Sequence, residues 1–201
     1  MSWIKTIAYE QASGRLRKLY DRIKGPGDNV DNIMLAHSLR PHTMEGHMAL
    51  YKHVIHHSSN KLEKQYLETV GVYVSLLNDC EYCIEHHFAG LCRLLQDQER
   101  AVAIRKALED EEPAAVFEGK ELAGLIYARM LTVDPSAIDE RDIDDLRESG
   151  FDDGEILELN QVSAYFAYAN RTVLGLGVKT DGDILGLSPG DSDDSSNWSH
   201  Q

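Results

Sequence analysis

Apolar residues recur along most of the chain at spacings of three and four, which is the periodicity of α-helices with one buried face. We find no sustained alternation of apolar and polar positions of the kind that predicts β-strands. The pattern therefore predicts an all-α protein. The expected helices cover residues 9–23, 33–38, 41–57, 61–77, 80–95, 98–109, 121–131, 140–149 and 153–175.

The length and the composition fit one domain followed by a short polar tail. A chain of 201 residues has the size of a single domain, and 42% hydrophobic with 27% charged residues is ordinary for a globular protein. We expect residues 1–185 to form one all-α domain. Residues 186–201 are rich in Ser, Asp and Gly, so we expect an acidic C-terminal tail there. Its one large apolar residue, Trp198, is a candidate to dock on a neighbouring subunit.

The charge is strongly acidic and unevenly spread. Lys and Arg number 20 against 34 Asp and Glu, which gives a formal net charge of −14, concentrated in residues 134–158 and 181–201. Such a balance disfavours binding to nucleic acid or to an anionic membrane, and we interpret the first acidic stretch as a solvated face. The chain has no apolar run that would span a membrane and starts with no apolar signal region, so we expect a cytoplasmic protein.

The candidate chemistry begins with three clustered cysteines, Cys80, Cys83 and Cys92. In a reducing compartment such a cluster indicates redox or metal chemistry more often than structural disulfides. Cys80 and Cys83 lie one turn apart at the start of a predicted helix that Asp79 could cap, so they could form a disulfide. Cys92 falls in an apolar run, and we expect it to be a buried core residue.

Two further residues could activate these thiols. His87 follows Cys83 by four residues, which brings the imidazole within reach of the thiol directly or through one water. Glu68 lies twelve residues before Cys80 in an apolar helix, where a carboxylate needs a partner unless it faces solvent. If the two helices form a hairpin, Glu68 meets His87 and can orient it. The helix dipole favours Cys80 as the nucleophile, but the nearby base favours Cys83 more strongly.

Other readings of the same residues stay open. Cys80, Cys83 and His87 could supply three zinc ligands, and the thiols could simply be buried structural residues. Covalent haem is excluded, because that attachment needs His directly after the second cysteine and Ile84 stands there. His86 could be a second base or a polar residue at the helix exterior. A fourth zinc ligand could in principle come from His53, His56 or His57.

The pattern of Glu68, eleven residues, Cys80, two residues, Cys83, three residues and His87 resembles a known active-site signature. It is similar to that of the alkylhydroperoxidase D-like branch of the carboxymuconolactone decarboxylase superfamily. The likeness extends over about residues 5 to 185 and is closest to the peroxidase-related subgroup. Three further stretches agree with it: Leu39-Arg40-Pro41, the polar positions from Asn78 to His87, and Asn170-Arg171, for which we favour a structural role.

The resemblance implies an all-α helical bundle with the CxxC pair at the N-terminus of a central helix. It also implies that Cys83 is the peroxidatic thiol, Cys80 the resolving thiol, His87 the proton acceptor and Glu68 its relay partner. The residue before the second cysteine is His in the best-known members and Tyr82 here, so any relay through this position would need a phenol. No metal or other cofactor is expected.

The sequence thus predicts a peroxidase that reduces organic hydroperoxides through the Cys80–Cys83 pair and is regenerated by an external dithiol or protein reductant. The alternatives are a disulfide reductase for a partner protein, a decarboxylase of the carboxymuconolactone type, and a zinc-stabilised structural module. We also expect a homo-oligomer, because the resemblance implies one and because the last predicted helix is apolar on more than one face. Its apolar residues are Val162, Tyr165, Phe166, Tyr168, Val173 and Leu174.

Overall fold

The computed structural model describes residues 2–201, so that Met1 of the predicted domain lies outside it. Within these residues the chain is helical, and its only β-type contacts are two isolated bridges. The all-α prediction is confirmed. The α-helices are α1 (Gly14–Ile23), α2 (Asn32–Ala36), α3 (Pro41–Ile55), α4 (Lys64–Leu77), α5 (Glu81–Leu95), α6 (Gln98–Glu109), α7 (Gly119–Val133), α8 (Glu140–Glu148) and α9 (Asp153–Leu176).

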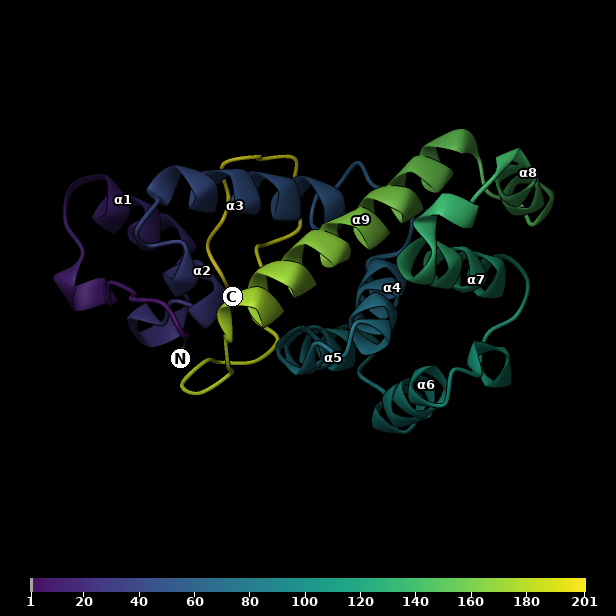
Figure 1. Ribbon diagram of the computed structural model, residues 1–201, viewed down its shortest axis with the longest axis horizontal. Coiled ribbons are helices and arrows are strands. Elements are labelled where there is room, and N and C mark those ends of the chain that lie inside the picture. The colour runs from purple at the N-terminus through teal and green to yellow at the C-terminus, as the bar shows by residue number, and fades with distance from the viewer. Residues whose placement is uncertain (1) are drawn as a thin grey trace.

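Helix α4 lies at the centre of the bundle and packs against α5, α7 and α9. The long α9 crosses the molecule, with α1 to α3 towards one end and α6 to α8 towards the other (Figure 1). The apolar run of α4 is buried on all sides, as its sequence predicts, and Val70, Val72 and Val74 have no exposed surface. At Gly71 an added Cβ would lie 2.2 Å from the Phe166 ring, so the glycine permits the close approach of α9.

The predicted boundaries are wrong in three places. The first helix begins at Gly14 rather than residue 9, because Gly14 has a φ of +57° that a continuous helix cannot contain. Helix α4 begins at Lys64 rather than residue 61, because the Glu158 carboxylate accepts hydrogen bonds from the backbone N–H groups just before it. Asp79 does not cap α5; it takes a left-handed φ of +55°, and Cys80 occupies the N-cap position.

Residues 186–201 fold back over α3, as the yellow ribbon in Figure 1 shows. The fully buried side chain of Lys52 anchors this segment: its ammonium donates to the carbonyl of Gly190 and to the hydroxyl of Ser192. Trp198, which we expected on a neighbouring subunit, instead packs within its own chain, 3.9 Å from the guanidinium of Arg22. Within residues 2–201, no helix combines the length and the apolar character that a membrane span requires.

Candidate active site

The hairpin of α4 and α5 brings together the carboxylate and the imidazole that the sequence singled out. The Asn78-Asp79 turn reverses the chain, so Glu68 on α4 faces the second turn of α5. His87 Nδ1 lies 2.7 Å from Glu68 Oε2, and the carboxylate is almost fully buried, with 2% of Glu68 exposed. A buried carboxylate needs such a partner, and the contact fixes the orientation of the His87 ring.

The two thiols lie side by side where α5 begins. Cys80 is at the N-cap position and Cys83 is in the first turn, and both are buried. The amide of Asn170 on α9 lies beside both thiols and helps to lower the pKa of each. Ser75 and Asn78 hold this amide in place, at 3.0 Å each. We expected only a structural role for Asn170, so the sequence missed its contact with the cysteines.

The pair of thiols holds its charge unequally. A hydrogen bond from the Cys83 thiol lowers the pKa of Cys80. That hydrogen bond to Cys80, together with burial, raises the pKa of Cys83 well above its ordinary value. The first negative charge therefore develops on Cys80, and the proton stays on Cys83.

A small cavity of about 40 Å³ lies against Cys83. It has room for about three water molecules. Glu68, Cys83 and His87 line one part of its wall, and Asp31 and His200 line another, whereas Cys80 does not reach it. No hydrogen bond joins the His87 ring to a thiol among the described residues, so the water-mediated alternative is the one that this geometry supports.

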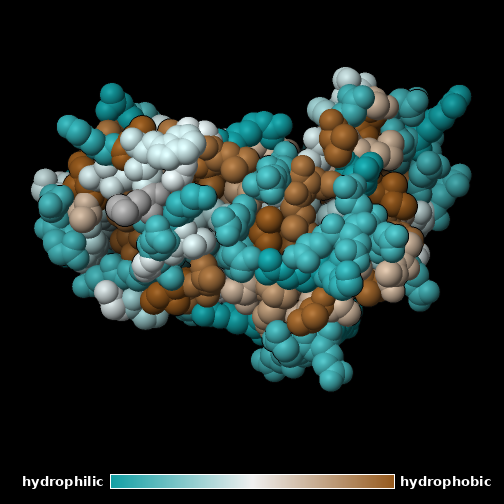
Figure 2. Space-filling model, turned by 60° about the horizontal axis from the view of Figure 1, so that its bottom comes forward, coloured by the Kyte–Doolittle hydropathy of each residue, from teal (hydrophilic) through white to brown (hydrophobic). Residues whose placement is uncertain are grey.

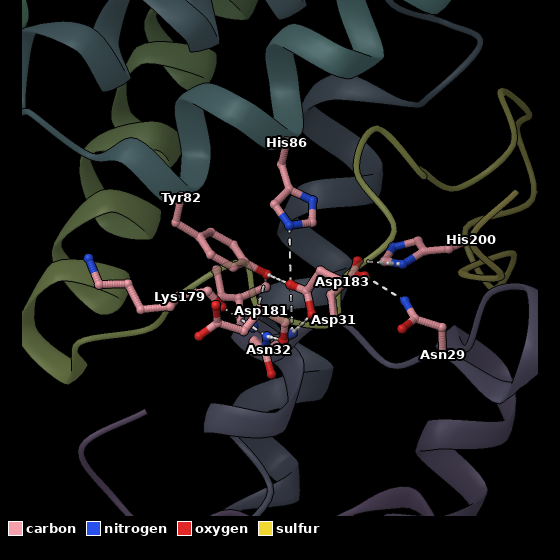
Figure 3. A network of polar contacts seen from close by, with 10 residues as sticks. Asn29, Asp31, Asn32, Tyr82, His86, Lys179, Asp181, Asp183 and His200 are labelled. Atoms are coloured by element: carbon pink, nitrogen blue, oxygen red, sulfur yellow. Dashed lines mark hydrogen bonds and ion pairs between the residues drawn. The ribbon is translucent and has the colours of Figure 1, made fainter. Parts of the chain in front are cut away.

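Tyr82 and His86 belong to a separate polar network (Figure 3). The Tyr82 hydroxyl donates to Asp183 Oδ2 at 2.7 Å, and His86 Nε2 lies 3.1 Å from the same oxygen. Burial and the Asp183 carboxylate raise the pKa of Tyr82 well above its ordinary value, so the phenol stays protonated. His86 is 9% exposed, so its placement at the helix exterior is wrong. The network ties the chain after α9 to α5 and to the backbone N–H of Asn32.

The third cysteine is not the core residue that we expected. Cys92 is only half-buried, on α5 near Arg105 of α6, because the edge of this helix pair remains partly open to solvent. Of the histidines considered as a fourth zinc ligand, His56 is buried whereas His53 and His57 stack on each other, with ring centroids 5.6 Å apart. Residues 2–201 contain no group of three His, Cys, Asp or Glu side chains arranged to hold a metal ion.

Two buried histidines near the cavity make stability depend on pH. Burial lowers the pKa of His47 to about 3 and holds that of His56 well below its ordinary value. Both are neutral in the folded protein, but they take up protons in the unfolded chain below about pH 6.5, so stability falls as pH falls from there. From pH 7.5 to 5 the expected loss is about 2 kcal/mol for His47 alone.

Urea unfolding at the two pH values measures this loss, and a His47→Gln variant isolates it. The variant lacks the titrating group, so its free energy of unfolding should change less between pH 7.5 and 5 than that of the wild type. An equal pH dependence of the two proteins would contradict a neutral, buried His47.

Comparison with known proteins places this geometry in a family. Residues 41–118 match the model of the carboxymuconolactone decarboxylase family. The fold is that of an alkylhydroperoxidase AhpD core protein, an uncharacterized peroxidase-related protein from Ralstonia eutropha JMP134. That structure has a TM-score of 0.76 and 21% identity over 90% of this chain and 93% of the other. No curated protein sequence matches the chain.

Two further solved structures share the fold. An uncharacterized peroxidase-related protein from Silicibacter sp. TM1040 has a TM-score of 0.69 and 24% identity over 77% of this chain and 78% of the other. The debrominase Bmp8, in complex with 2,3,4-tribromopyrrole, has a TM-score of 0.71 and 14% identity over 90% and 95%. The predicted resemblance is thus confirmed for the superfamily: the chain has the alkylhydroperoxidase D-like fold, and its segment 41–118 belongs to the carboxymuconolactone decarboxylase family.

Proposed function

We propose that this protein is a thiol-dependent peroxidase that reduces small hydroperoxides through Cys80 and Cys83. The observation that carries the proposal is that Cys83 faces a small cavity whose wall also contains the Glu68–His87 pair, with Cys80 directly behind it. A nucleophile, a base and a residue that orients the base are the parts that this chemistry needs.

The proposed reaction has three steps. The Cys83 thiol loses its proton to His87 through a water in the cavity, and the thiolate sulfur attacks one peroxide oxygen. The O–O bond breaks, Cys83 becomes a sulfenic acid, and the other oxygen leaves as an alcohol or water after taking up a proton. The Cys80 thiolate then displaces hydroxide from the sulfenic acid to form a disulfide, which an external dithiol reduces by exchange.

The size and the closure of the site favour this function over the alternatives. A space for about three waters accepts a small hydroperoxide but not a brominated ring such as the tribromopyrrole bound to the debrominase. Cys80 and Cys83 are 0% and 2% exposed, which disfavours direct attack on a disulfide of a partner protein. Lactone decarboxylation would leave the paired cysteines without a role.

Thiol counting tests the proposal. The reduced protein is treated with one equivalent of hydrogen peroxide, and we expect the loss of two thiols, an 80–83 disulfide by peptide mass spectrometry, and recovery with a small dithiol. A Cys92→Ser variant serves as the control and should behave identically. A bridge through Cys92, or no thiol loss, would refute the peroxidase. About one zinc per chain in protein purified without added metal would instead favour the structural module.

We also propose that the protein is a homo-oligomer. Helix α9 buries most of its apolar side chains but leaves Leu157, Tyr168 and Leu174 exposed, at 59%, 40% and 43%. Hydrophobic residues interrupt the polar surface at several places in Figure 2. A monomeric mass in sedimentation at micromolar concentration would overturn this proposal.

A further inference from the structure

The C-terminal segment brings a second carboxylate–imidazole pair to the cavity. His200 Nδ1 lies 3.1 Å from Asp31 Oδ2, and the two residues are only 5% exposed each. Figure 3 shows His200 reaching from the C-terminal segment towards Asp31, which precedes α2. The reaction described above uses Glu68 and His87 but leaves this pair without a role.

We propose that His200, oriented by Asp31, donates the proton to the oxygen that leaves when Cys83 attacks a hydroperoxide. This inference rests on the proposed peroxidase function and deepens it. His200 would touch the substrate and act as a catalytic residue, whereas Asp31 would act through His200 as a positioning residue.

The nitrogen that faces no protein partner carries this proposal. His200 Nε2 is buried and has no hydrogen-bond partner among the described residues, although the other ring nitrogen is held by Asp31. A buried polar atom without a partner is costly, and here it belongs to a side chain that lines the same cavity as Cys83. A substrate oxygen or a water in that cavity would satisfy it.

The placement of the two imidazoles suits a division of labour. His87 and His200 each pack edge-on against the ring of Tyr51, with centroids 6.2 and 6.3 Å away. His87 comes from α5 and is paired with Glu68, whereas His200 comes from the far end of the chain and is paired with Asp31. One imidazole can therefore serve the attacking sulfur while the other serves the departing oxygen.

The chemistry needs such a donor. When the Cys83 thiolate bonds to one oxygen of R–O–O–H, the O–O electron pair goes to the other oxygen, which is a strongly basic alkoxide or hydroxide unless it is protonated. A protonated His200 gives its Nε2 proton to that oxygen, releases an alcohol or water, and becomes neutral. The Asp31 carboxylate stabilises the imidazolium before transfer. The sulfur is oxidised and the peroxide oxygen is reduced, so no further reactant is required.

Two oxidants with different leaving groups test the role of His200. Hydrogen peroxide releases hydroxide, which needs a proton, whereas peracetic acid releases acetate, which does not. We compare the single-turnover rate of Cys83 oxidation in the wild type and in His200→Asn, whose amide can keep the hydrogen bond to Asp31. The expected result is a loss of about 100-fold or more with hydrogen peroxide but only a few-fold with peracetic acid.

Control variants separate the proton donor from a structural contact. Asp31→Asn keeps His200 but removes the charge that orients it, so we expect a smaller loss with the same preference for peracetic acid. Trp198→Phe perturbs the same segment outside the cavity and should leave the ratio of the two rates unchanged. Equal slowing of both oxidants in His200→Asn, or no slowing, would overturn the inference while leaving the peroxidase intact. A wild type that reacts with neither oxidant would refute the proposed function itself.

Discussion

Replacing Cys83 by serine is expected to abolish the reaction with hydroperoxide, whereas replacing Cys80 by serine should leave one reaction per chain. Cys83 is the thiol that lines the cavity, and Cys80 lies behind it without reaching the space that a substrate would occupy. Only a sulfur that meets the peroxide can attack it. The Cys80→Ser protein should therefore stop at a sulfenic acid on Cys83, because no resolving thiol remains.

The charge distribution within the pair points the other way and makes this prediction sharper. The first negative charge lies on Cys80, and its hydrogen bond with Cys83 raises the pKa of the thiol that should attack. A serine at position 80 removes that neighbouring charge and can donate a hydrogen bond to a Cys83 thiolate. We therefore expect the pKa of Cys83 to be lower in Cys80→Ser than in the wild type.

Stopped-flow peroxide consumption and trapping of the sulfenic acid with dimedone measure these outcomes. The pH dependence of the burst in Cys80→Ser reports the pKa of the remaining thiol. Cys92→Ser is the matched control, since it removes a thiol of the same helix that does not line the cavity. If Cys83→Ser still gives a burst and the trapped sulfur is Cys80, the order of attack is reversed.

The local part of this site could be predicted from the sequence. Spacings of three and four identify α4 and α5, and a two-residue turn between two apolar helices leaves them little choice but to pack side by side. This packing places Glu68 beside His87, as the hairpin argument expects. Helix periodicity carries that information because it extends only over a few turns of adjacent segments.

The distant part of the site could not be predicted, because it depends on where an irregular segment lies. Asp183 and His200 come from stretches rich in Gly, Ser and Asp, whose composition indicates the absence of helix but not a position in space. One signal was available. Leu187 and Trp198 are large apolar residues in an otherwise polar stretch, and both turn out to be buried and to hold the segment over the cavity wall.

Replacing Glu68 by glutamine is expected to slow the oxidation of Cys83 by about 100-fold or more at neutral pH. The carboxylate accepts a hydrogen bond from His87 Nδ1–H, which leaves Nε2 free to take a proton. The amide of glutamine can instead donate to Nδ1, which places the imidazole proton on Nε2 and removes its ability to act as a base. The isosteric change keeps the packing beside Gly90, so the loss measures the proton relay rather than a cavity.

The dependence of this loss on pH separates a base from a structural residue. At high pH, solvent hydroxide ionises Cys83 without help from His87, so the rates of Glu68→Gln and wild type should converge as the solution becomes alkaline. Single-turnover rates between neutral and alkaline pH measure the convergence, and Glu63→Gln, an exposed carboxylate directly before the same helix, is the control that should match the wild type. A defect of constant size at every pH would show that Glu68 holds the structure together without serving the proton transfer.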